Sequence, residues 1–511
     1  MRILLLRRRA FAALAAAAVA SASASARAQS TLITGAFVID GSGAPGRITD
    51  VRIIDDRIAD IGILRARPGE RVVQAAGLVL APGFIDTHSH ADDGIFAHPD
   101  ALADVSQGIT TVIVGQDGGS IFPLGDFFRK LAKQPATVNV ASFSGHGTIR
   151  ERVMGKDYKR HATADEIAKM KQLLEDDMQV GALGLSSGLE YDPGIYSDSS
   201  ELFDLMRGLD AEHGRYISHI RSEDFAFWQA IHELFAIGEH AKIPVQISHI
   251  KLAIRSNWGL ADSLVGVMGT ARLQGVNVTA DIYPYTYWHS DLSVLIPSRK
   301  FTDRGDAAFA LANVVPATGL RLTAYDPNPS YVGHTLAEIA AMRHEDDTTA
   351  LMALEQQSDS MARAVGHGVD GILGESMIEK DIERLLQWPF ADICTDGELD
   401  GAHPRGFGAF TRVLGVYVRE RHVITLEEAV RKMSALAATN MGLVDRGRIA
   451  VGMYADLVLF DPTTVGDRAT LQEPHAVSAG IVQTWVNGAV VYRAGVATSA
   501  RPGRVLRRGA P

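Results

Sequence analysis

Histidines and aspartates recur in this chain just after short apolar runs. His88 and His90 form a His-Ser-His segment after residues 83–87, and Asp117 stands in a Gly-Gln-Asp-Gly segment after residues 110–115. The complete set is His88, His90, Asp117, His219, His249 and Asp396. Imidazole and carboxylate groups are ligands of Zn²⁺ and other divalent ions. These residue types predict a site for one or two ions, with room for a bound water.

Each of these residues alone has an ordinary structural explanation. A histidine such as His219 can be a core residue with its hydrogen bonds satisfied, Asp117 can cap a helix, and Asp396 can belong to a turn. His88 and His90, however, would point to the same side of an extended strand, because side chains alternate along it. The joint placement of all six residues at the ends of apolar runs favours a metal site.

The elements that must position these residues are short apolar runs separated by helical segments. The runs are residues 83–87, 110–115, 138–143, 182–186, 216–219, 245–249, 276–282 and 391–395. Eight runs alternating with helices predict an α/β fold, a (β/α)₈ TIM-like barrel. The active site of such a barrel lies at the carboxyl ends of its strands, where the six residues fall.

Two further features of the barrel region can be predicted. Residues 164–179 carry an apolar face, with Thr163 and Glu166 as a capping box before it and Gly181 as a stop, which predicts a helix. Residues 287–363 are too long for one crossover between strands. We expect an insertion there, after the seventh strand, that covers the active site.

Both ends of the predicted mature chain show short β patterns. Residues 32–41, 51–58, 455–461 and 481–488 have strand character, and Asn487-Gly488 is a hairpin signal. We predict a small β-sandwich domain formed by residues 29–80 and 442–511, with the barrel spanning residues 81–441.

Residues 1–28 have the pattern of a signal peptide. Arginines come first, an apolar stretch of about ten residues follows, and Ala26-Arg27-Ala28 has a small-x-small cleavage pattern. The stretch is too short to span a bilayer of about 30 Å. Arg8-Arg9 resembles a twin-arginine signal, and an ordinary Sec signal is the alternative. The prediction is a periplasmic or secreted protein with no membrane span in its mature chain.

Composition excludes several classes of protein. The formal net charge is −10, and loss of five arginines with the signal would make it more negative, which argues against nucleic acid as a partner. Cys394 is the one cysteine, so neither an internal disulfide nor a cysteine-rich zinc site can form.

Several motifs show a resemblance to a known family. The chain resembles the amidohydrolase superfamily, and within it the N-acyl-D-amino-acid deacylase (D-aminoacylase) branch. The segments that carry the resemblance are residues 82–90 (PGFIDTHSH), 145–150 (GHGTIR), 247–251 (ISHIK), 281–286 (DIYPYT), 403–408 (HPRGFG) and 452–458 (GMYADLV). One departure is evident: the branch usually has Gly-Asn-Cys-Gly where this chain has Gly115-Gln116-Asp117-Gly118.

The resemblance implies roles for individual residues. His219, His249 and Asp117 would hold a tightly bound Zn²⁺. His88, His90 and Asp396 would form a second position, and Asp396 would also transfer protons. The residues that the resemblance implies in binding a substrate carboxylate are Lys251, Tyr283 and Arg405. Apart from the resemblance, Tyr191 is a candidate to line the pocket, with simple packing as the alternative.

The predicted function is hydrolysis of the amide bond of an N-acyl-D-amino acid, or a related small acylated amino acid, by hydroxide formed from water on the metal. Within the same superfamily, the alternatives are a dipeptidase, a carboxypeptidase-like enzyme or a cyclic-amide hydrolase. The alternative from another class is a non-catalytic periplasmic protein that binds metal or a solute. The expected partner is a small acylated amino acid or dipeptide, and the sequence does not predict the oligomeric state.

Overall fold

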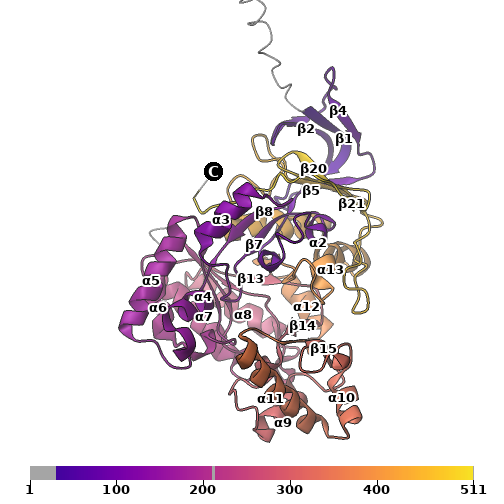
Figure 1. The fold of residues 1–511 in the computed structure, drawn as a ribbon. Helices are drawn as coiled ribbons and strands as arrows, with labels where there is room; N and C mark the ends of the chain where they lie inside the picture. Colours follow the sequence, from indigo (N-terminus) through magenta and orange to yellow (C-terminus); the bar gives the residue numbers. More distant parts are fainter. Residues whose placement is uncertain (1–29, 210–212, 510–511) are drawn as a thin grey trace, which may run out of the picture.

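A parallel β-barrel forms the centre of the molecule (Figure 1). The computed structural model describes residues 30–209 and 213–509. Its barrel strands are β6 (Phe84–Asp86), β7 (Ile109–Val114), β8 (Asn139–Ser142), β9 (Ser144–Gly145), β10 (Gly184–Gly188), β11 (Arg215–His219), β12 (Val245–Ile247), β13 (Val278–Ile282) and β17 (Ala391–Ile393). Each of the eight apolar runs contains or overlaps one of these strands, and β9 is a short addition before β10.

The strands pair in parallel and in chain order, and hydrogen bonds close the ring. One sheet runs β6-β7-β8 and the other β9-β10-β11-β12-β13-β17. The Leu183 amide donates to the Ser142 carbonyl at 2.9 Å, and the Asp396 amide donates to the His88 carbonyl at 2.8 Å. The second contact joins the last strand to the first, so residues more than 300 positions apart in the chain meet at the barrel rim.

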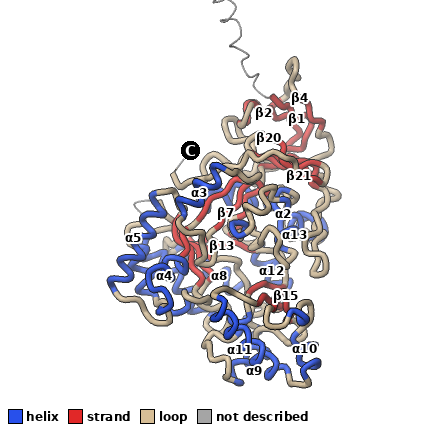
Figure 2. The backbone as a smooth tube through the Cα atoms, in the orientation of Figure 1, coloured by secondary structure: helices blue, strands red, loops and turns tan. Residues whose placement is uncertain are grey.

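Helices surround the barrel strands (Figure 2). Their bounds are α2 (Leu102–Val105), α3 (Leu124–Lys133), α4 (His146–Met154), α5 (Ala164–Gln179), α6 (Ser199–Met206), α7 (Phe227–Ala241), α8 (Ala261–Leu273), α12 (Glu379–Leu386), α13 (Arg405–Arg412), α14 (Leu426–Arg431) and α15 (Ala437–Met441). Helix α5 has the predicted bounds, and Thr163 and Glu166 form the capping box. Gly181 follows two residues after its end, at φ +105°.

Strands from the two ends of the described chain form one further sheet. Its order is β21-β20-β19-β18-β5-β1-β2-β3, and β4 also pairs with β1. The bounds are β1 (Ser30–Val38), β2 (Arg47–Ile54), β3 (Arg57–Gly62), β4 (Arg71–Gln74), β5 (Val79–Pro82), β18 (Leu457–Phe460), β19 (Ile481–Val486), β20 (Ala489–Arg493) and β21 (Val496–Ala497). We call it the terminal sheet; its description as a β-sandwich, and the domain boundaries, stay predictions.

The predicted hairpin lies in the terminal sheet. Asn487 and Gly488 join β19 to β20 with φ values of +47° and +77°, the left-handed backbone that this turn requires. A side chain on Gly488 would come within 1.9 Å of the Asp55 carbonyl oxygen.

Between β13 and β17 the chain forms a separate small unit. Strands β14 (Tyr287–Ser290), β15 (Leu320–Tyr325) and β16 (Asp370–Glu375) make an antiparallel sheet of order β14-β16-β15. Helices α9 (Arg304–Asn313), α10 (Leu336–Arg343) and α11 (Asp347–Val365) accompany it, at the end of the molecule opposite the terminal sheet (Figure 1). The expected insertion, residues 287–363, lies here, and β16 extends the unit to Glu375. We call residues 287–375 the insertion.

The predicted signal peptide, residues 1–28, lies outside the described residues. Across residues 30–209 and 213–509, no helix combines the length and the hydropathy needed to span a membrane.

Candidate metal centre

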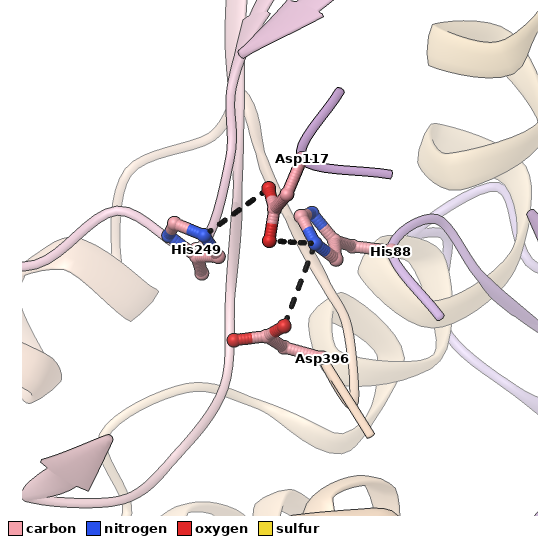
Figure 3. Close-up of side chains that lie close together, drawn as sticks. All are labelled: His88, Asp117, His249 and Asp396. Atoms are coloured by element: carbon pink, nitrogen blue, oxygen red, sulfur yellow. Dashed lines mark ion pairs between the residues drawn. The ribbon is translucent and has the colours of Figure 1, made fainter. Parts of the chain in front are cut away.

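The carboxyl ends of the barrel strands bring histidines and aspartates together. His88 follows β6, Asp117 follows β7, His249 follows β12 and Asp396 follows β17. One ligand atom from each of these residues lies within 4.8 Å of those of the others. Figure 3 shows the Asp117 carboxylate between His249 and His88, with Asp396 below them and paired with His88. The four residues can surround one ion.

Asp117 presents its two carboxylate oxygens to different histidines. Its Oδ2 atom lies 3.4 Å from His88 Nε2 and 3.5 Å from His90 Nε2. Its Oδ1 atom lies 3.5 Å from His249 Nε2. A carboxylate in this position can contribute an oxygen to each of two neighbouring ion positions. The resemblance implied that Asp117 joins His219 and His249, and the structure places its carboxylate near His88 and His90 as well.

The remaining predicted ligands extend the group in two directions. His90 Nε2 lies 3.2 Å from Asp396 Oδ1, and His219 Nδ1 lies 3.1 Å from His249 Nε2. His219, His249 and Glu223 form a second set whose ligand atoms lie within 4.8 Å of one another. The structure therefore brings all six predicted ligand residues to one place.

The donor atoms at this place fit a divalent cation. Both ring nitrogens of His88 and the Oδ1 atom of Asp117 are buried without a hydrogen-bond partner among the described residues. Unpaired buried polar atoms are costly, so native structures rarely leave them unsatisfied. A divalent ion could bind His88 Nε2, which faces Asp117 and Asp396, whereas His88 Nδ1 faces Asp281 at 3.7 Å. The ligand types suit zinc.

The backbone at these residues is strained. Asp117, His249 and Asp396 have φ values of +51°, +34° and +49°, a left-handed region that side chains rarely adopt. Such conformations cost of the order of 1–3 kcal/mol each, and they cluster at functional sites. In this backbone conformation the three side chains, each at the end of a strand, point toward a common centre.

Close backbone packing fixes the loop that carries Asp117. A side chain on Gly118 would come within 2.8 Å of the Gly188 nitrogen, and one on Gly145 within 2.5 Å of the Gly118 carbonyl oxygen. Gln116 Nε2 donates to the carbonyl oxygens of Thr87 and Ile113, both at 3.0 Å. These contacts join the loops after β6, β7 and β10, so Asp117 is held firmly.

Opposite charges at the centre keep its carboxylates ionised. Burial alone would raise the pKa of Asp396, but Arg405, His249 and other imidazoles lower it well below its usual range. Burial likewise opposes ionisation of His88, yet Asp117 and Asp281 raise its pKa to about 10. A field this negative favours a cation between the side chains.

Lys251 lies at the centre as predicted, but it is already paired. Its Nζ atom lies 2.5 Å from Glu223 Oε1 and 2.7 Å from His249 Nδ1. Lys251 and His249 do face the same place. Glu223, in the loop after β11, neutralises the lysine that was expected to bind a substrate carboxylate by itself.

Arg405 and Tyr283 line the cavity and carry hydrogen-bonding atoms that have no partner among the described residues. Arg405 Nη1 lies 2.6 Å from Asp396 Oδ2, and its guanidinium carbon lies 4.7 Å from the centre of the Tyr283 ring. The Tyr283 hydroxyl and the Arg405 Nε atom are buried without a hydrogen-bond partner among the described residues. Both groups suit the carboxylate of a bound molecule.

A cavity of about 310 Å³ opens over the centre. All the predicted site residues line it except His88, which is fully buried beneath. Tyr191 packs on His219 with ring centres 4.4 Å apart. The insertion supplies Trp288, His289 and further residues to the wall. A volume near 300 Å³ is enough for a small ligand.

Several site residues were absent from the sequence prediction. Glu190 accepts from His219 Nε2 at 2.9 Å, and Asp281 accepts from the His249 amide at 2.6 Å. Glu223 and His289 line the cavity. Glu190 and Glu223 lie in loops that follow barrel strands. Carboxylates at such positions could have been predicted as site residues from the sequence. No pattern pointed to His289, because it belongs to the insertion.

A parallel barrel whose strand ends gather imidazoles and carboxylates around a cavity defines the class of metal-dependent barrel hydrolases. Residues 71–260 and 334–492 match the model of the amidohydrolase family. An N-acyl-D-glutamate deacylase of Alcaligenes xylosoxydans xylosoxydans is 39% identical, with 94% of this chain and 96% of that protein covered. A D-aminoacylase of the same organism is 35% identical, with 94% and 98% covered.

A solved structure agrees with these relatives. The N-acyl-D-glutamate deacylase of Bordetella bronchiseptica, complexed with zinc and a phosphonate mimic of the tetrahedral intermediate, is 37% identical. The match has a TM-score of 0.83 and covers 94% of this chain and 99% of that one. The chain belongs to the amidohydrolase family, in the branch of the N-acyl-D-amino-acid deacylases, and it is a metal-dependent hydrolase of amide bonds.

Proposed function

We propose that this protein hydrolyses N-acyl-D-amino acids to a carboxylic acid and a free D-amino acid. The observation that carries the proposal is the placement of unsatisfied donors for a carboxylate, on Arg405 and Tyr283, in the same cavity as the metal centre. A molecule whose carboxylate binds there can present a neighbouring amide to the centre. The relatives support this substrate class, since their names specify N-acylated D-amino acids.

We further propose that the resident metal is Zn²⁺, in one or two positions. Zinc would activate a water and polarise the scissile carbonyl. His88, His90, Asp117 and Asp396 would hold one ion, and His219 and His249 would complete the other position with Asp117.

The protein's own groups would then orient the substrate and move its proton. Arg405, beside Tyr283, would bind the α-carboxylate in a planar, bidentate manner. Asp396 is ionised and lies at the cavity wall, so it can accept a proton from the attacking water and deliver it to the leaving nitrogen. Amines leave poorly unless protonated, so this transfer is needed for an amide.

The proposal is tested with matched pairs of substrates. Purified protein is analysed for metal and then incubated with N-acetyl-D- and N-acetyl-L-amino acids, dipeptides and a hydantoin, with amine release measured by ninhydrin. We expect release from the N-acetyl-D series. Release from L-dipeptides or from the hydantoin alone would replace the proposal by one of the alternative hydrolase activities. Metal binding without any turnover would favour the non-catalytic alternative.

We also propose that the protein is exported by the N-terminal signal, which supports a periplasmic or secreted location. Fractionation of the native cell with N-terminal sequencing of the mature protein tests this. A protein retained in the cytoplasm with an intact N-terminus would contradict it.

A further inference from the structure

The cavity continues from the metal centre into the insertion. Its outer wall is apolar, formed by Trp288, Val294, Leu295 and Val314. Two carboxylates, Asp291 and Asp370, line the same wall. They are neighbours, because the Leu292 amide donates to Asp370 Oδ1 at 2.7 Å. An apolar passage with carboxylates beside it has the character of a site for a long side chain that ends in a cation.

The hydrogen bonds of these two carboxylates come from neutral donors. Asp291 accepts from the Ser293 hydroxyl at 2.6 Å, and Asp370 accepts from the Ser358 hydroxyl in addition to Leu292. No described cation forms an ion pair with Asp291 or Asp370. Asp291 and Asp370 therefore have hydrogen-bond donors but no ion-pair partner among the described residues.

The cations nearest to the cavity are engaged elsewhere. Lys251 pairs with Glu223, and Arg405 pairs with Asp396. Arg299 pairs with Asp192 at 3.0 Å and donates to the carbonyl oxygens of Glu190 and Ser293. Burial, followed by the nearby Arg405, lowers the pKa of His289 to about 4, so this imidazole is neutral at pH 7.

A third acid, Glu355, lies beside these two carboxylates behind the cavity wall. Glu355 is 1% exposed, and its Oε1 atom has no hydrogen-bond partner among the described residues. It lies one helical turn before Ser358 on α11, on the face that contacts Asp370. Burial, then Asp370 and Asp291, raise the pKa of Glu355, whereas the nearby Arg299 lowers it.

We propose that the insertion selects D-amino acids with a basic side chain, so that the preferred substrates are Nα-acyl derivatives of D-lysine, D-ornithine or D-arginine. The methylene groups lie against Val294, Leu295 and Val314, and the ammonium or guanidinium group binds Asp291 and Asp370. This deepens the proposed function and rests on it. A side-chain carboxylate, as in N-acyl-D-glutamate, meets like charge here and is disfavoured.

Substrates of equal shape and different charge test the proposal on the unmodified protein. The kcat/KM values are compared for Nα-acetyl-D-lysine and N-acetyl-D-norleucine, for Nα-acetyl-D-arginine and Nα-acetyl-D-citrulline, and for N-acetyl-D-glutamate, all by acetate release. We expect each basic member to exceed its neutral partner at least about tenfold, because a charge-assisted contact is replaced by a neutral group. N-acetyl-D-glutamate should be the poorest. Equal values within the pairs, or preference for D-glutamate, would overturn the inference.

The panel separates this inference from the proposed function. Turnover of neutral D-substrates with no gain for basic ones overturns only the selectivity, whereas no turnover of any N-acetyl-D-amino acid rejects the function itself. A further arm compares glycyl-D-norleucine with N-acetyl-D-norleucine. A gain for the dipeptide without a gain for D-lysine would show that the carboxylates bind an α-ammonium group instead, which also contradicts the proposal.

Substitutions of the two carboxylates test whether they bind the basic side chain of the substrate. Asp291→Asn and Asp370→Asn keep the side-chain shape, and each should reduce the ratio of kcat/KM for Nα-acetyl-D-lysine to that for N-acetyl-D-norleucine about tenfold. Asp347→Asn, an exposed carboxylate on the same insertion, is the matched control and should leave the ratio unchanged. An unchanged ratio in Asp291→Asn and Asp370→Asn proteins whose circular dichroism and Tm match those of the unmodified protein would overturn the assignment.

Discussion

The barrel mouth and the insertion line one cavity, but they balance charge in opposite ways. At the barrel mouth, each of Asp117, Asp396 and Glu223 faces a histidine, a lysine or an arginine. In the insertion, Asp291, Asp370 and Glu355 face neutral donors or no donor. The mouth therefore pairs its carboxylates with cationic or imidazole side chains of the protein, whereas Asp291 and Asp370 have no ion-pair partner among the described residues. This difference is the basis of our proposal that the mouth performs the reaction and the insertion selects the substrate.

The largest effect on turnover is expected at the mouth, from Asp396→Asn. The amide cannot take the water's proton, so kcat should fall about 10³-fold or more, while its oxygen still contacts the metal position and metal content is retained. Stopped assays and metal analysis of the same sample measure both. Asp400→Asn, an exposed carboxylate four residues on, serves as the control. A metal-loaded Asn variant with near-normal kcat would remove Asp396 from proton transfer.

Among the substitutions considered, Asp117→Asn is expected to reduce the metal content of the protein most. Asp117 offers one oxygen to His88 and His90 and the other to His249, so the loss of its charge weakens both ion positions. Zinc content after dialysis should fall below that of the unmodified protein, and activity should fall about 10²-fold and recover in part with added zinc. Full metal content after the same dialysis would show that Asp117 is not shared between positions.

Arg405→Lys should reduce kcat/KM about 10²-fold, mainly through KM, because lysine cannot form the planar bidentate contact with a carboxylate. The matched test uses N-acetyl-D-leucine and its carboxamide, which lacks the charge. The loss should be large with the acid and small with the amide. Equal losses of kcat/KM with the acid and the carboxamide would show that Arg405 acts through its ion pair with Asp396 and not through the substrate carboxylate.

The same contrast explains what could be predicted from the sequence. The barrel strands were predictable because parallel strands are buried on both faces, and runs such as residues 109–114 are wholly buried. Their carboxyl ends meet at one rim, so His88, His219 and Asp396 could be joined without knowing any distance. The capping box of α5 and the Asn487-Gly488 turn are local patterns, and both formed as predicted.

Contacts between loops could not be predicted in the same way. The pairing of Lys251 with Glu223 depends on how the loop after β11 folds back over the end of β12. The insertion has no repeating pattern, since its small sheet pairs strands separated by helices. Which of its residues reach the cavity is decided by that pairing, so Asp291, Asp370 and His289 escaped sequence reasoning.

A cation introduced into the insertion should change which substrate is preferred without abolishing hydrolysis. Val294→Arg introduces a cation beside Asp291 on a half-exposed position of the cavity wall. We expect the ratio of kcat/KM for N-acetyl-D-glutamate to that for Nα-acetyl-D-lysine to rise about tenfold or more. Val332→Arg, at an exposed site of the insertion, is the control. If N-acetyl-D-glutamate stays as poor a substrate as before, the insertion does not contact the side chain.

The smallest effect on turnover is expected far from the cavity, in the terminal sheet. Glu70 accepts from Arg52 Nε at 2.7 Å, with side chains 1% and 4% exposed. Glu70→Gln removes the buried one of the two carboxylates that pair with Arg52 and leaves only Asp60, at 3.0 Å from Arg52 Nη1. We expect Tm to fall by a few degrees near pH 7, whereas kcat and the lysine-to-norleucine ratio stay unchanged.

The pH dependence of this difference in Tm gives a second measurement. The hydrogen bond from Arg52, together with those from Ser30 and Arg67, lowers the pKa of Glu70 from 4.5 to about 2. Since the folded pKa lies below the unfolded one, the stabilisation is present above pH 4.5 and is lost as pH falls toward 2. The Tm difference between the two proteins should shrink over that interval. A loss of turnover in Glu70→Gln at neutral pH would mean that the terminal sheet also positions the metal centre. The terminal sheet would then contribute to the reaction as well as to stability.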